Sequence, residues 1–357
     1  MATYDIDPQL SSLAHMKPPF NRASVMASEL VLGPLINKER SDERVSVARI
    51  DVPARDGATV RTVLYTPVAA SDSATASPAP ESPLPCLLYI HGGAFAMSGA
   101  GYHYQLARTY AERLGCLVLY VDYRLAPANP FPTPLYDCLD ALAWLLGRSV
   151  ATAEKTAGPN GEAVVPEAPQ VDLARIAIGG DSAGGALAAS LVYAARDELG
   201  FTPCAQMLVY PMADLHAHGE SMELYVDTPM FNARQAPTSW DFYLGKDGSR
   251  TPEAQRLLDE HPEYAWPAAA AENPIDSGRR DLMEGLPPAY VETCEFDCLH
   301  DEGLAYARAL EAAGVDVDLN ETHRTVHGYD FILDCDLTRD AIARRCAFLR
   351  RWMGTRR

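Results

Sequence analysis

The stretch Arg175-Ile-Ala-Ile-Gly-Gly-Asp-Ser-Ala-Gly-Gly-Ala186 decides how this chain folds. A short apolar strand ends at Ile178, Gly-x-Ser-x-Gly follows with Ser182 at its centre, and an alanine-rich helix is expected from Ala183 to Leu199. Glycines two residues either side of a serine are typical of a sharp strand-to-helix turn, where larger side chains would collide with the neighbouring elements. Such a turn lifts the serine hydroxyl above the sheet, so the pattern indicates a nucleophilic Ser182.

Outward from Ser182, continuous apolar strands alternate with helices, which is typical of a parallel sheet buried on both faces. A hairpin around Asp56-Gly57 opens the fold, with strands expected at 46–53 and 58–67. Further strands are expected at 86–90, 116–121, 205–210, 289–295 and 315–321, and helices at 104–114, 136–146 and 301–313. A last helix carries Ile342, Cys346, Leu349 and Met353 on one face, and we interpret its many arginines as a solvated face. The fold class is therefore α/β.

Two segments interrupt this alternation and indicate a cap over the sheet. Residues 1–45 show no strand pattern, and residues 213–285 are rich in proline, aromatics and charge. We therefore expect a catalytic domain built from residues 46–212 and 286–357. The low-complexity stretches 70–83 and 150–170 are expected to be flexible loops.

Charge and cysteine content exclude several classes of partner. The 357 residues include 30 Lys and Arg against 48 Asp and Glu, a net charge of −18, which repels phosphate backbones and anionic lipid head groups. No apolar run approaches the ~18 residues of a membrane-spanning helix. The acidic start lacks the features of a signal peptide, and the eight cysteines include no Cys-x-x-Cys pair. We expect a cytoplasmic protein that binds neither nucleic acid nor membranes, and we assign no metal to Cys294-x3-Cys298.

A serine hydroxyl needs an imidazole to take its proton, and six histidines follow Ser182 in the sequence. We favour His327, because His327-Gly lies a few residues beyond the last expected strand, at the sheet edge where Ser182 also points. His323 is the nearest rival, but it lies closer to the strand and lacks a following glycine. Asp297 ends a strand at the same edge and can orient the imidazole, whereas Asp301 and Glu302 begin a helix that acids commonly stabilise.

His91-Gly-Gly-Ala94 follows the strand at 86–90 and completes the candidate site. A glycine pair after a strand frees backbone N–H groups to point at a ligand, so this loop is a candidate oxyanion hole.

In these motifs the sequence resembles the bacterial hormone-sensitive-lipase-like family of α/β-hydrolases. The resemblance also rests on Tyr123-Arg-Leu-Ala-Pro127 and Asp297-Cys-Leu-His-Asp-Glu302, and it covers the chain from about residue 45 to the end. It implies an α/β-hydrolase fold with a helical cap, a mostly parallel sheet, and no cofactor. It implies Ser182 as nucleophile, His327 as base, Asp297 as its orienting acid, and an oxyanion hole formed by Gly92, Gly93, Ala94 and Ala183.

Three positions depart from the family pattern. Ala94 stands where many members have a third glycine, Cys298 replaces the usual proline after the acid, and Ala128 replaces a common glutamate. We expect the Ala94 methyl to shape specificity, and we expect Ala94→Gly to lower stability slightly, because glycine loses more backbone entropy on folding. Nothing in the sequence explains Ala128.

The residues and the resemblance together predict a serine carboxylesterase that hydrolyses short-chain acyl esters of small molecules. The alternatives are an amidase or deacylase on the same three residues, or a non-catalytic small-molecule binding protein on a hydrolase scaffold. Family members also make a homodimer an expectation. The aromatic residues that we expect to line or cover the acyl pocket, or else only to pack the cap, are Phe20, Trp240, Phe242 and Tyr243.

Overall fold

The computed structural model describes residues 4–68, 83–148, 166–216, 219–272 and 282–355. The loops expected at 70–83 and 150–170 lie outside the described residues, apart from their last few positions.

One sheet of eight strands runs through the molecule in the order β1-β2-β4-β3-β5-β6-β7-β8. The hairpin strands β1 and β2 are antiparallel, β2 is antiparallel to β4, and every later pair is parallel, so the α/β prediction is confirmed. The strand bounds are β1 Val45–Pro53, β2 Thr59–Pro67, β3 Leu84–Ile90, β4 Leu117–Asp122, β5 Val171–Asp181, β6 Ala205–Val209, β7 Ala289–Phe296 and β8 Val317–Val326.

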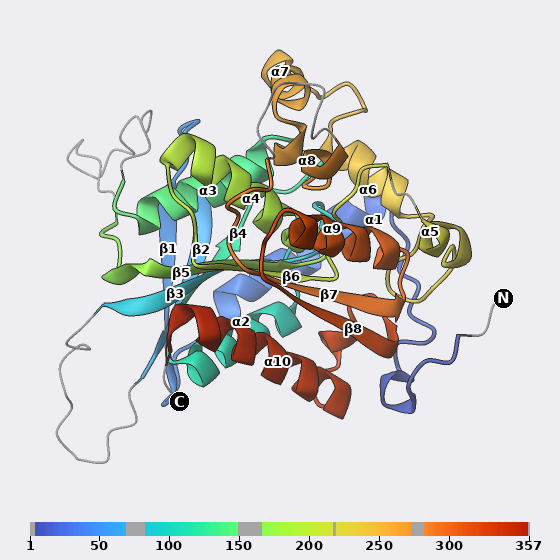
Figure 1. Cartoon of the computed structure of the whole chain (residues 1–357), viewed down its shortest axis with the longest axis horizontal. Helices are drawn as coiled ribbons and strands as arrows, with labels where there is room; N and C mark the ends of the chain where they lie inside the picture. The colour runs from blue at the N-terminus through green and yellow to red at the C-terminus, as the bar shows by residue number, and fades with distance from the viewer. Residues whose placement is uncertain (1–3, 69–82, 149–165, 217–218, 273–281, 356–357) are drawn as a thin grey trace.

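Helices cover both faces of this sheet (Figure 1). On one face lie α3 (Thr133–Leu145), α4 (Ala183–Leu199) and α9 (His300–Ala312), and on the other lie α2 (Gly101–Leu114) and α10 (Asp336–Met353). The buried apolar residues form two clusters, one on each side of the sheet. This explains why the central strands carry continuous apolar runs instead of an alternating pattern.

The arginines of α10 do not all form the solvated face that we expected. Arg345 is 1% exposed and forms ion pairs with Glu292 and Asp330, which are also buried. It lies three residues after Ile342 and four before Leu349, so helical periodicity places it on the apolar face of α10. A long charged side chain can occupy such a face where buried carboxylates pair with it.

The N-terminal segment and the insertion after β6 contact each other. The N-terminal segment holds η1 (Pro8–Leu10), α1 (Arg22–Leu32) and η2 (Gly33–Lys38). The insertion holds α5 (Glu220–Leu224), α6 (Ala236–Tyr243), α7 (Pro252–Glu260), η3 (Pro262–Tyr264) and α8 (Ala269–Glu272). The backbone N–H of Met230 donates to the Met16 carbonyl at 2.6 Å, and the Gln235 side chain donates to the Pro18 carbonyl at 2.8 Å. Within the described ranges, no helix is both long and apolar enough to cross a membrane.

Candidate active site

Ser182 occupies the turn between β5 and α4. Its φ of 55° lies in the left-handed region, and its N–H donates to the Val209 carbonyl at 2.8 Å. A Cβ at Gly180 would come within 2.5 Å of the Ile90 carbonyl oxygen, and a Cβ at Gly184 would collide with the backbone of Ile90 and His91. Only glycine fits at either position, which is the physical reason for the Gly-x-Ser-x-Gly pattern.

His327 directly follows β8 and lies between a hydroxyl and a carboxylate. Its Nε2 is 2.8 Å from Ser182 Oγ, and its Nδ1 is 2.7 Å from Asp297 Oδ2. Asp297 is fully buried and also accepts a hydrogen bond from the Leu299 N–H at 3.0 Å. Since a carboxylate can only accept, Nδ1 carries the proton and donates to Asp297, which leaves the Nε2 lone pair facing the Ser182 hydroxyl.

The rival residues lie elsewhere. The His323 side chain is 82% exposed, with its Nδ1 3.7 Å from a Glu295 oxygen. Asp301 accepts from the Ser221 N–H at 2.9 Å, and Glu302 accepts from the Ala213 N–H at 2.7 Å.

The last strand, β8, runs to Val326, five residues beyond the expected end, with a register shift opposite Cys294 to Phe296. His327 is therefore held at the strand end, and not a few residues into a loop.

The His91–Ala94 loop lies beside Ser182. Gly93 and Ala94 line the same cavity as Ser182, whereas a Cβ at Gly92 would meet Asp181, and Ala183 begins α4. Three consecutive residues have positive φ, 123° at Gly93, 53° at Ala94 and 61° at Phe95. Backbone entropy alone does not decide the stability of Ala94→Gly, because Ala94 occupies a backbone region that a Cβ disfavours by about 1–2 kcal/mol.

His91 anchors this loop as a neutral ring. The imidazole is stacked between the rings of Tyr120 and Tyr123, with centroids 5.5 and 4.5 Å away. Its Nδ1 donates to the Gly92 carbonyl at 2.6 Å, and its own carbonyl accepts from the Tyr123 hydroxyl at 3.0 Å. Burial, with the nearby His103, lowers the pKa of His91 to about 3. His91 therefore orders the loop as a neutral ring near neutral pH, with its Nδ1 proton held by the Gly92 carbonyl.

A cavity of about 170 Å³ opens above Ser182. Leu32 reaches it from the N-terminal segment, Met230 and Phe231 from the insertion, and Tyr102 from α2. The Phe231 ring also contacts His327, with centroids 5.2 Å apart. Since these side chains are mostly apolar, the cavity suits the hydrocarbon part of a small ligand.

The four aromatic residues expected at the acyl pocket are not among those that line this cavity. Trp240 and Tyr243 pack on Phe95, which directly follows the His91–Ala94 loop, with centroids 5.2 and 4.0 Å away. Phe20 packs on Phe242 at 5.9 Å. The structure thus places two of them behind the loop and the other two against each other.

Sequence reasoning missed the residues that form the cavity wall. Met230 and Phe231 lie in the irregular insertion, and Tyr102 lies at the start of a helix, so neither periodicity nor a motif marks them. Tyr210, which also lines the cavity, could have been predicted from its position in the sequence. It directly follows β6, the neighbour of β5, and parallel strands bring their carboxyl ends to one edge of the sheet.

One group of side chains could offer metal ligands, at a distance from Ser182. Among the described residues, Asp197, His261 and Glu263 place ligand atoms within 4.8 Å of one another. Asp197 lies near the far end of α4, roughly 20 Å along the helix from Ser182 at 1.5 Å per residue. Hydrogen bonds already engage these side chains, from Arg196 and Tyr264 to Asp197 and between His261 and Glu263.

The Cys298 thiol, which stands where the family usually has a proline, is buried, and burial raises its pKa.

Comparisons with known proteins agree with this geometry. A family model described as alpha/beta hydrolase fold matches residues 87–331. The chain is 32% identical to esterase LipI of Mycobacterium tuberculosis over 80% of this chain and 75% of that protein. It is 31% identical to ethyl acetate hydrolase of Pseudomonas putida over 81% and 77% of the two chains. Among solved structures, a bacterial heroin esterase superposes with a TM-score of 0.74 at 32% identity, covering 99% of both chains.

Proposed function

This chain belongs to the α/β-hydrolase family of carboxylic ester hydrolases, and we propose that Ser182, His327 and Asp297 are the three residues that carry its reaction. The observation that carries the proposal is the pair of contacts at His327, 2.8 Å to Ser182 and 2.7 Å to Asp297. This arrangement is that of a hydroxyl nucleophile, its general base, and the acid that fixes the tautomer of the base.

In the first half of the reaction the Ser182 hydroxyl attacks the ester carbonyl while His327 Nε2 takes the proton. Asp297 stabilises the imidazolium that forms, because it already accepts the Nδ1 proton. The carbonyl oxygen becomes an oxyanion, and we assign its stabilisation to the backbone N–H groups of Gly93, Ala94 and Ala183. His327 then gives its proton to the departing alcohol, which leaves an acyl group on Ser182.

In the second half a water molecule replaces the alcohol. His327 takes a proton from the water, the resulting hydroxide attacks the acyl carbonyl, and the same N–H groups stabilise the second oxyanion. The proton returns to Ser182 as the carboxylic acid leaves. The helix α4 begins directly after Ser182, so its N-terminal dipole favours the negative charge in both halves.

We propose short acyl esters as the substrates. The cavity beside Ser182 is small, and residues from the N-terminal segment and the insertion line part of it. Two similar proteins carry names that refer to acetyl esters, ethyl acetate hydrolase and heroin esterase. A small cavity favours a short acyl group over a long chain, because added methylenes gain binding energy only where apolar wall remains to cover them.

The test is hydrolysis of a chromogenic acetate ester by the wild type and by Ser182→Ala. We expect a loss of about 10⁴-fold or more in kcat, since the three residues act as a unit. A matched anilide of the same acyl group distinguishes an esterase from an amidase. Retention of ester hydrolysis within about tenfold in Ser182→Ala contradicts the assignment of Ser182.

We also propose that the protein is cytoplasmic and acts as a homodimer. All eight cysteines are free, which supports a reducing compartment. The homodimer rests on the family resemblance alone, and sedimentation at micromolar concentration measures it.

A further inference from the structure

A buried cluster of charged and phenolic groups contacts the residues that follow β8, His327 to Asp330, which we call the His327 loop. The Arg345 guanidinium donates to Asp330 Oδ2 at 2.8 Å and to Glu292 Oε1 at 2.5 Å, and all three side chains are at most 1% exposed. Although burial opposes it, the Arg345 charge lowers the pKa of Glu292, whereas burial raises the pKa of Asp330. We call Glu292, Asp330 and Arg345 the Arg345 cluster.

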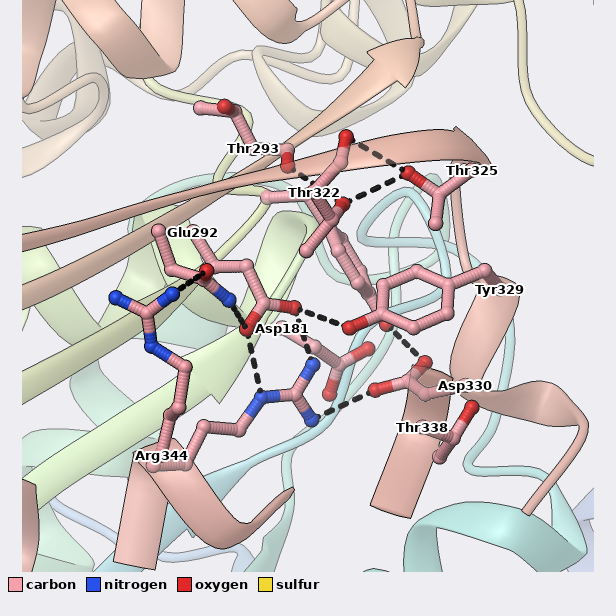
Figure 2. Close-up of polar contacts among 12 residues, drawn as sticks. Asp181, Glu292, Thr293, Thr322, Thr325, Tyr329, Asp330, Thr338 and Arg344 are labelled. Atoms are coloured by element: carbon pink, nitrogen blue, oxygen red, sulfur yellow. Dashed lines mark hydrogen bonds and ion pairs between the residues drawn. The ribbon is translucent and has the colours of Figure 1, made fainter. Parts of the chain in front are cut away.

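This cluster holds the His327 loop at the two residues that follow His327-Gly328. The Tyr329 hydroxyl donates to Glu292 Oε1 at 2.9 Å (Figure 2), and Asp330 pairs with Arg345 at 2.8 Å. Both bonds cross from the loop to other elements, to β7 through Glu292 and to α10 through Arg345. The loop is therefore tied to two rigid elements within three residues of the imidazole.

A third connection runs from the cluster to the imidazole itself. The Tyr210 hydroxyl donates to Asp330 Oδ1 at 2.5 Å, and the Tyr210 ring meets the His327 ring edge to face, with centroids 4.8 Å apart. Tyr210 has a φ of 34°, so its backbone is held in a region that disfavours a bulky side chain. The residue before it, Val209, accepts the Ser182 N–H. Tyr210 thus contacts the base and adjoins the residue that fixes the nucleophile.

From these contacts we infer that Tyr210, anchored through Asp330 to Arg345, is a positioning residue that holds the His327 imidazole in line between Ser182 and Asp297. The inference rests on the proposed function, because it assigns Tyr210 a role in that reaction. A hydrogen bond from a phenol to a buried carboxylate has a narrow preferred geometry, so it fixes where the ring stands. The ring in turn limits rotation of the imidazole, whose misplacement by 1 Å is enough to cost about a hundredfold in rate.

The cluster offers a matched control. Tyr290 donates its hydroxyl to Glu292 Oε2 at 2.6 Å, so Tyr290→Phe removes the same kind of bond from the same cluster. Its ring packs on Phe348, with centroids 5.8 Å apart, on the α10 side of the sheet. Substitution of Arg345 itself is less informative, because it leaves two carboxylates buried and can unfold the protein.

The experiment compares Tyr210→Phe with Tyr290→Phe by kinetics and by NMR. We expect Tyr210→Phe to lower kcat about tenfold with KM within twofold, and Tyr290→Phe to leave both within twofold at a similar Tm. The proton on His327 Nδ1, assigned as the signal lost in His327→Gln, should be sharp and far downfield in the wild type and in Tyr290→Phe. In Tyr210→Phe it should broaden or exchange with water.

The NMR comparison does not require turnover, so it remains decisive even if the wild type hydrolyses no ester. Equal kcat in the two variants overturns the inference. So does a fall in kcat with an unchanged Nδ1 proton, because Tyr210 then acts on the substrate and not through His327. A disturbed proton with full activity also overturns it, because orientation of the imidazole is then not limiting.

Discussion

Acid should destabilise the protein through one group that anchors the His91–Ala94 loop, the buried His91 imidazole. The pKa of His91 is about 3 in the folded protein, because burial disfavours its charged form, whereas a histidine in the unfolded chain titrates near 6.5. Between these two values the unfolded chain binds more protons, so the free energy of unfolding falls as the pH is lowered. The contribution of His91 is therefore present near pH 7 and is progressively lost below about pH 6.5.

The expected size follows from the two pKa values. Lowering the pH from 7 to 4.5 should remove about 2.5 kcal/mol of stability through His91, at 1.36 kcal/mol per pH unit over the two units below 6.5. His91→Asn keeps a side-chain N–H donor but cannot be protonated. We expect it to be less stable than the wild type at pH 7, because the amide does not fill the space between Tyr120 and Tyr123.

The assay is urea unfolding of both proteins at pH 7, 5.5 and 4.5. The difference in unfolding free energy between wild type and His91→Asn should shrink by about 2.5 kcal/mol across this range. Carboxyl groups that do not contact His91 titrate alike in both proteins and cancel in the difference, whereas Asp122, 3.8 Å from His91 and with its pKa raised by burial to about 6, can add to it. His323→Asn is the control for the loss of an exposed histidine, and its difference is compared with that of His91→Asn at each pH. A constant difference for His91→Asn would refute the assignment of a neutral, acid-labile anchor.

Three further results are expected. His327→Ala should lower kcat as far as Ser182→Ala, about 10⁴-fold, whereas His323→Ala should keep it within twofold when both are measured on a chromogenic acetate. Ala94→Gly relieves about 1–2 kcal/mol of left-handed backbone strain, but it loses about 0.5–1 kcal/mol to backbone entropy and about 0.8 kcal/mol to the missing methyl. Its free energy of unfolding, measured in urea, should therefore stay within about 1 kcal/mol of the wild type. Activity on a series of p-nitrophenyl esters should peak between acetyl and octanoyl, and full activity on long-chain emulsions would contradict a cavity of about 170 Å³ as the acyl site.

The sequence was sufficient to place the residues that a local pattern marks. Ser182 is marked by its two glycines, because the turn leaves no space for a Cβ at either of them. Asp297 and His327 follow from the rule that parallel strands end at one edge of the sheet. The main error at this edge was the end of β8, since a register shift opposite β7 adds residues that no alternation of apolar and polar side chains reveals.

Residues whose role depends on packing between distant segments could not be predicted in this way. Leu32 and Phe231 meet at the cavity from segments about 200 residues apart, and no local pattern joins them. Arg345 was assigned to a solvated face because arginine is usually exposed. Its position between Ile342 and Leu349 on the apolar face of α10 was the available signal, and the buried Glu292 on β7 was the partner to look for.

Trp240 and Tyr243 of the insertion support the loop beside Ser182 through Phe95. Gly93, Ala94 and Phe95 all have positive φ, and two of the three carry a Cβ that disfavours this conformation. Strain of this kind persists only where surrounding contacts fix it. Phe95 is fully buried and is stacked on Tyr243 at 4.0 Å, and its carbonyl accepts from the Ala126 N–H at 3.0 Å. The contact between α6 and Phe95 therefore helps to hold the loop beside Ser182, which links the insertion to the site although these aromatic side chains do not line the cavity.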